Sequence, residues 1–184
     1  SISGYAFSGS GLTSVELPAS VKTVGEGAFA RCKNLASATV GSENIGKDAF
    51  YADAALAALT LNKEVKTIGD GAFKSCAALT GINIEGSALE SIGDEAFAYT
   101  SISALDLSAQ KSLKTVGGWA LAKTPISTAT LPNSVSSVGE GTFFYAAQLE
   151  TTNLPDSLTT VPAFTFAGAE ALVGESIVPA TVTE

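Results

Sequence analysis

A phenylalanine recurs along this chain at nearly constant intervals. Seven of the nine phenylalanines, together with one leucine, fall on a single ladder with steps of 21 to 24 residues. The members of this ladder are Phe7, Phe29, Phe50, Phe73, Phe97, Leu121, Phe143 and Phe166. A period of this size is typical of a solenoid, in which each repeat is one coil that cannot bury its apolar side alone. The spacing therefore predicts a single array of about eight coils over residues 1–184.

Between the ladder residues lies a recurring segment of the form Leu-x-x-apolar-x-Leu, as in Leu12, Val15 and Leu17. The last two apolar positions are two residues apart, which is the periodicity of a strand with one buried face. Because successive coils are connected in the same sense, these strands are expected to lie side by side and parallel. The Ala-Phe step of each coil is expected to form a single turn of 3₁₀- or α-helix. The predicted fold is an α/β-type solenoid, a right-handed coil with a parallel β-sheet on the concave face and short helical turns or loops on the convex face.

Two further columns of the repeat carry small residues. A glycine follows the second apolar pair in six coils, at Gly25, Gly46, Gly69, Gly93, Gly117 and Gly139. Glycine there indicates either a positive φ or a very close approach to the neighbouring coil. Three residues after the ladder stands a small side chain, which in two coils is Cys32 or Cys76, whereas Asp53 is the exception. The cysteines are two coils apart, roughly 9–10 Å at the strand spacing, so we expect free thiols instead of a disulfide, which needs Cα atoms within about 7 Å.

Composition excludes several classes of function. The formal charge of −8 and the scattered Lys and Arg residues disfavour binding to nucleic acid or an anionic membrane. No histidine is present, which removes the commonest general base and the commonest metal ligand. No stretch approaches the roughly 18 apolar residues of a membrane-spanning helix, so membrane insertion is not expected. We find no catalytic constellation, no metal site and no cofactor motif, and the prediction is that the chain is not an enzyme.

The unit from Leu12 through Pro18 and Val24-Gly25-Glu26-Gly27-Ala28-Phe29 to Cys32 resembles a leucine-rich repeat of the BspA-like, bacterial surface-antigen family. The resemblance covers residues 2–182, because strand, glycine, Ala-Phe and small-residue positions recur in order. It implies a secreted or cell-surface protein of bacteria or of some parasitic protists, used in adhesion and in contact with host proteins. The chain opens inside one repeat and stops where another should begin, which indicates a segment of a longer protein.

One candidate contact surface is the row of side chains that point outward at the penultimate strand position. Its members are Glu16, Thr39, Thr60, Asn83, Asp106, Thr130 and Asn153. Solenoids usually bind on the concave side, which favours this row. The row contains no aromatic residue and no Arg, the side chains that dominate protein-binding hot spots, so it is also explained as a surface that keeps the sheet soluble.

A second candidate is aromatic. Tyr99, Trp119, Phe144 and Tyr145 fall near one back edge across three consecutive coils. These rings either fill gaps between irregular turns, with Trp119 compensating for the smaller Leu121, or form an exposed contact patch. Acids also recur before the Ala-Phe step, at Glu26, Asp70, Asp94 and Glu140, where capping of a helical turn explains them better than binding of a cation.

The function expected from these features is a non-catalytic, secreted or cell-surface interaction module that presents a rigid curved surface to a host extracellular or cell-surface protein. Two alternatives remain open at this point. The array could be a structural stalk that holds another domain away from the cell, or an accessory module of a surface hydrolase whose chemistry lies elsewhere in the parent chain.

Overall fold

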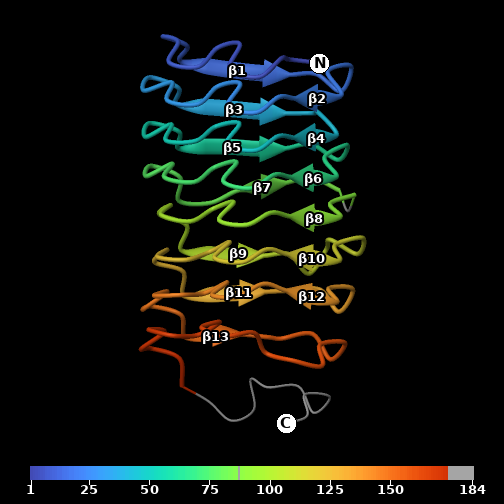
Figure 1. Ribbon diagram of the computed structural model, residues 1–184, viewed down its shortest axis with the longest axis vertical. Helices are drawn as coiled ribbons and strands as arrows, with labels where there is room; N and C mark the ends of the chain where they lie inside the picture. The colour runs from blue at the N-terminus through green and yellow to red at the C-terminus, as the bar shows by residue number, and fades with distance from the viewer. Residues whose placement is uncertain (87, 174–184) are drawn as a thin grey trace.

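The coils of the solenoid carry two kinds of strand, which run in opposite directions across the coil (Figure 1), and the coil of β13 has only the first kind among the described residues. The computed structural model describes residues 1–86 and 88–173, and the end of the predicted array, 174–184, lies outside the described residues. The first kind comprises β1 (Ser14–Leu17), β3 (Ser37–Val40), β5 (Ala58–Leu61), β7 (Asn83–Ile84), β9 (Ala104–Asp106), β11 (Thr128–Thr130) and β13 (Thr151–Thr152). The second kind comprises β2 (Thr23–Val24), β4 (Asn44–Ile45), β6 (Thr67–Ile68), β8 (Ser91–Ile92), β10 (Thr115–Val116) and β12 (Ser137–Val138).

Strands of one kind pair only with each other, in parallel and in repeat register. Val15 of β1 lies opposite Ala38 of β3, and Ala38 lies opposite Leu59 of β5. These are equivalent positions of the predicted strand motif, so the predicted parallel sheet is confirmed. The second kind of strand forms a six-stranded parallel sheet of its own, from β2 to β12. These strands lie at the second apolar pair of each repeat, and the sequence motif did not predict a strand there.

The sheet of the first kind is interrupted once. β1, β3, β5 and β7 form a four-stranded sheet, and β9, β11 and β13 form a separate three-stranded sheet. The coils on either side of this break are the two longest steps of the ladder, at 24 residues each. Near it, the Gln110 side chain is buried and donates a hydrogen bond from Nε2 to the Gly86 carbonyl at 2.9 Å. The sheet of the second kind continues across the break, since β8 pairs with β10.

The ladder residues form the centre of the core. The rings of Phe7, Phe29, Phe50, Phe73 and Phe97 are stacked on one another, with neighbouring centroids 5.1–5.5 Å apart and interplanar angles of 3–11°. Leu121 is buried in the next coil, and Phe143 and Phe166 resume the stack at 5.6 Å. Centroid separations of about 4.5–7 Å are those of favourable aromatic pairs. The predicted meeting of like side chains from successive coils is confirmed.

The Ala-Phe steps form consecutive tight turns, and none of the described residues is helical. The expected helical turn is therefore replaced by another structure. Phe29 N–H donates to the Ala49 carbonyl of the next coil at 2.8 Å, and Phe50 N–H donates to the Ala72 carbonyl at 2.8 Å. A helix would direct these amides along the chain to residues within the same turn. Here they point along the axis of the solenoid and bind neighbouring coils together.

The six repeated glycines are explained by close approach, because none of them has a positive φ. A Cβ at Gly69 would lie 2.7 Å from the Gly46 carbonyl carbon and 2.8 Å from the Ile45 oxygen. At Gly139 it would lie 2.1 Å from the Gly118 nitrogen. These glycines let the backbones of consecutive coils pass at a distance that no side chain permits.

Candidate functional site

The outward row of the first-kind strands is continuous within each sheet. Glu16 lies opposite Thr39, Thr39 opposite Thr60, and Thr60 opposite Asn83. Asp106 lies opposite Thr130 in the three-stranded sheet, and Asn153 directly follows β13. We call this row of seven residues the strand face. Its register is the one expected from the sequence.

Two side chains of the strand face are engaged by nearby backbone. Asn153 accepts a hydrogen bond from the Leu131 amide at 2.9 Å and donates one to the Leu131 carbonyl at 2.8 Å. The Asp106 carboxylate accepts a hydrogen bond from the Ser108 amide at 2.8 Å, and this bond holds the pKa of Asp106 below its ordinary value. These contacts serve the local backbone, which leaves the strand face with small polar groups to offer a partner.

The turns around the ladder have an unusual backbone. At each of the eight ladder positions, the residue two before it and the residue two after it have φ between 52° and 79°. These sixteen residues are Tyr5, Gly9, Gly27, Arg31, Asp48, Ala52, Gly71, Ser75, Glu95, Tyr99, Trp119, Lys123, Gly141, Tyr145, Phe164 and Gly168. We call the surface that carries them the turn face. A left-handed conformation costs a residue with a Cβ roughly 1–2 kcal/mol, so glycine is the expected occupant.

Four aromatic residues from three consecutive coils gather on the turn face. The Trp119 ring lies 4.7 Å from Phe144 and 6.4 Å from Phe164, and Phe144 lies 4.5 Å from Tyr145. Tyr145 and Phe164 are 56% and 57% exposed, whereas Trp119 and Phe144 are half-buried. We call these four residues the aromatic cluster. Trp119 contacts Phe144 and Phe164 on the turn face. Leu121 is itself buried in the core, so these contacts do not make Trp119 a substitute for a missing ring at position 121.

Tyr99 and Phe164 depart from the grouping suggested by the sequence. Tyr99 lies beside the cluster and contacts a cation, with Lys123 Nζ 5.1 Å from its ring centroid. Phe164 belongs to the cluster, although the sequence patch did not include it. The signal was present, because Phe164 stands two residues before Phe166, as Trp119 stands two residues before Leu121.

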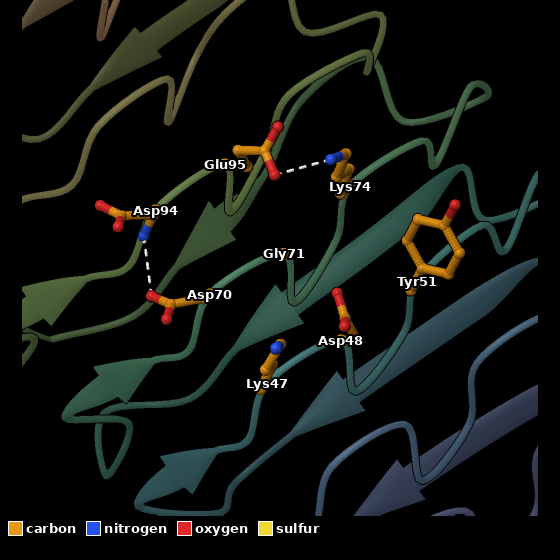
Figure 2. A pocket seen from close by; sticks show the side chains of 8 residues that line it. All are labelled: Lys47, Asp48, Tyr51, Asp70, Gly71, Lys74, Asp94 and Glu95. Carbon is orange, nitrogen blue, oxygen red and sulfur yellow. Dashed lines mark hydrogen bonds and ion pairs between the residues drawn. The ribbon is translucent and has the colours of Figure 1, made fainter. Parts of the chain in front are cut away.

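A polar groove of about 420 Å³ lies on the same face, over three coils (Figure 2). It opens where Gly71 carries no side chain between Asp48 and Glu95, which occupy the equivalent position in the flanking coils. Lys74 forms an ion pair with Glu95 at 2.6 Å across it. The lining of the groove reaches Glu95, whose amide donates to the Gly118 carbonyl in the coil that carries Trp119. No sequence motif marks this groove, since it depends on a missing side chain.

The recurring acids join neighbouring coils. Asp70 Oδ1 accepts a hydrogen bond from the Asp94 amide at 2.9 Å, and Asp94 Oδ1 accepts one from the Gly118 amide at 2.7 Å. Glu26 accepts a hydrogen bond of 2.6 Å from the Tyr5 hydroxyl, which raises the pKa of Tyr5. The expected capping of a helical turn is therefore wrong for Glu26, Asp70 and Asp94, because each of these three acids binds a group of an adjacent coil.

The cysteines are free thiols, as expected. Both are buried, and each donates to a backbone carbonyl of a preceding coil: Cys32 to Phe7 and Cys76 to Phe50, at 3.1 Å each. In the described part of the chain, no three His, Cys, Asp or Glu side chains gather closely enough to hold a metal ion. The same residues contain no helix that could cross a bilayer.

Comparisons with known proteins agree with this geometry. A family model described as the BspA type leucine rich repeat region matches six copies over residues 1–110 and 87–184. A leucine-rich repeat protein from Bacteroides ovatus is 24% identical with a TM-score of 0.80, over 92% of this chain and 46% of its own length. One from Eubacterium ventriosum is 19% identical with a TM-score of 0.55, over 81% of this chain and 33% of its own.

A leucine rich cell surface protein from Faecalibacterium prausnitzii is 17% identical with a TM-score of 0.49, over 98% of this chain and 71% of that protein. No curated protein matches the chain. The chain thus spans less than half of the Bacteroides ovatus protein that it resembles. The family model, by contrast, covers the whole sequence. The chain belongs to the BspA-type leucine-rich repeat family.

Proposed function

We propose that residues 1–184 act as one non-catalytic interaction module, which binds an extracellular or cell-surface protein through the aromatic cluster. The observation that carries this proposal is the placement of Tyr145 and Phe164. Both rings are more than half exposed, and both sit at positions with φ of 53° and 59°. Some other coils carry glycine at the equivalent positions, as at Gly9 and Gly141, and the remaining coils carry residues with a Cβ.

An aromatic residue at such a position is unfavourable on two counts. The left-handed backbone costs roughly 1–2 kcal/mol for a residue with a Cβ, and the exposed ring recovers little of this by burial. Residues with a Cβ keep this backbone in other coils too, such as Arg31 and Lys123, so the strain belongs to the fold, and the exposure of large rings from neighbouring coils is what points to a contact. Large, stiff aromatic side chains are also the groups that most often dominate binding between proteins. A role in binding accounts for both features of the cluster.

The strand face supports a weaker form of contact. Its side chains are small or acidic, and Asn153 and Asp106 are already hydrogen-bonded to nearby backbone. Location at the cell surface is supported by membership of the BspA-type family, which the sequence resemblance associates with surface proteins. We therefore assign the turn face the principal contact and the strand face a secondary one.

Replacement of the exposed rings by glycine tests this assignment with little risk to the fold, because glycine suits a positive φ. We would measure the affinity of the double variant Tyr145→Gly/Phe164→Gly for a panel of purified extracellular-matrix and mucosal proteins. Loss of two hot-spot side chains is expected to weaken binding by at least about tenfold. The matched control is Tyr5→Gly, which removes an exposed ring at the position equivalent to Phe164, at the opposite end of the array.

The control variant should bind as tightly as the native chain. Equal affinity of the double variant and the native chain would contradict a role for the aromatic cluster and would direct attention to the strand face. Failure of the native chain to bind any protein of the panel would favour a stalk, in which the array only separates other domains.

A further inference from the structure

One coil carries a carboxylic acid in the interior of the solenoid. In all the other coils, the position three residues after the ladder residue holds a small side chain. These are Ser10, Cys32, Cys76, Thr100, Thr124, Ala146 and Ala169. Asp53 takes this place in the third coil with 0% of its surface exposed, and it is the only charged residue type buried among the described residues.

The surroundings of Asp53 compensate a negative charge poorly. Oδ1 accepts one hydrogen bond, from the Cys32 amide at 2.7 Å, and Oδ2 has no hydrogen-bond partner. The titratable groups that flank it in this column are the thiols of Cys32 and Cys76, in the preceding and the following coil. A carboxylate with one hydrogen bond in a dry interior is costly, because burial disfavours the charged form.

Cations lie on both neighbouring coils, but each is directed elsewhere. Arg31 of the preceding coil is exposed and lies 5.6 Å from the Tyr51 ring centroid, and Lys33 is exposed as well. Lys74 of the following coil is paired with Glu95. Burial raises the pKa of Asp53 to about 8, against the opposing effect of the Cys32 amide. Burial and the Asp53 charge also raise the pKa of the Cys76 thiol.

We propose that Asp53 is a pH-sensitive joint in the solenoid, whose ionisation opens the contacts between the coils that carry Cys32, Asp53 and Cys76. In the closed stack the acid stays protonated, whereas in an open stack it is hydrated and ionises at its ordinary value near 3.8. Below that value both forms are protonated and pH has no effect. Between about 3.8 and about 8 only the open form releases a proton, so rising pH favours opening.

Linkage sets the size of the effect. When one proton is released on opening, the equilibrium constant for opening rises about tenfold per pH unit. The rise ends near pH 8, where the closed form ionises too. Opening admits solvent to two thiols that the closed stack buries, so their chemical accessibility reports the equilibrium directly.

The test is alkylation of Cys32 and Cys76 by iodoacetamide between pH 6 and pH 9, quantified for each peptide by mass spectrometry. The control is Asp53→Thr, because Thr100 and Thr124 occupy the same column and donate to carbonyls of their own turns at 2.8 Å. Dividing the native rate by the rate of this variant at each pH removes the ionisation of the thiols themselves. The ratio should rise about tenfold per pH unit up to about pH 8 and then level off.

Asp53→Asn, which keeps the shape of the side chain and cannot ionise, should behave as Asp53→Thr does. If neither variant folds, amide hydrogen exchange of the native chain provides the test. After correction for the intrinsic exchange rate, the equilibrium constant for opening should rise with pH in the coil of Asp53 and should not rise in the coil of Thr124. A ratio of alkylation rates that stays constant from pH 6 to pH 9, or equal pH dependence of opening in the two coils, would overturn the proposal.

Discussion

At Gly69 two coils approach each other too closely to admit a side chain. The sequence offered two explanations for this glycine column, a positive φ or a close approach, and only coordinates separate them. The left-handed positions of the turn face, in contrast, are occupied by residues as different as Arg31, Asp48 and Trp119. No residue type marks them, because the hydrogen bonds between coils impose the conformation whatever the side chain is. Local sequence therefore predicted the glycines and missed the strained positions.

Gly69→Ala is expected to destabilise the protein by about 1–3 kcal/mol, because the new methyl group would meet backbone that cannot move independently. The matched control is Gly81→Ala, since a Cβ at Gly81 meets nothing within 4 Å and its φ is not positive. That change should be neutral or slightly stabilising. Urea unfolding of both variants measures the difference, and equal midpoints would contradict the close approach at Gly69.

The strands and the ladder were predictable because they depend on apolar periodicity, which burial enforces in each coil. The conformation of the Ala-Phe turn was not predictable. A helical turn with hydrogen bonds inside the turn and a tight turn with hydrogen bonds to the next coil have the same sequence pattern. The break between β7 and β9 also escaped prediction, since it depends on how the longest coils place their extra residues. Ion pairs also join neighbouring coils. Glu43 pairs with Lys22 at 2.7 Å and with Lys66 at 3.0 Å, and these two cations lower the pKa of Glu43.

The stacked rings should carry much of the contact between coils. Phe73 is fully buried between Phe50 and Phe97, and Phe73→Ala is expected to cost about 3–5 kcal/mol. Phe7 is stacked on one side only and is 43% exposed, so Phe7→Ala should cost clearly less. Chemical denaturation followed by circular dichroism compares the two, and equal losses would argue against stability that accumulates from nearest-neighbour coils.

The stack of coils carries two surfaces of different chemistry, the strand face and the turn face. The strand face was predictable residue by residue, because alternation along a strand fixes which side chains point outward. The aromatic cluster was predictable in part: three of its four members were identified, but Phe164 and the separate contact of Tyr99 required the positions of rings from different coils. The periodic sequence pattern predicts that both faces exist. It does not indicate which of them contacts a partner, because that depends on how side chains from several coils come together.

Hydrogen exchange on the complex with a captured protein partner tests the central claim most directly. Bound partner should slow amide exchange in the turns that carry Trp119, Tyr145 and Phe164 and leave the strands β3 and β5 unchanged. The turn amides of the opposite end, around Tyr5, serve as the internal reference and should also be unchanged. Protection confined to β3, β5 and the other strands of the first kind would contradict the account, because it would place the partner on the strand face.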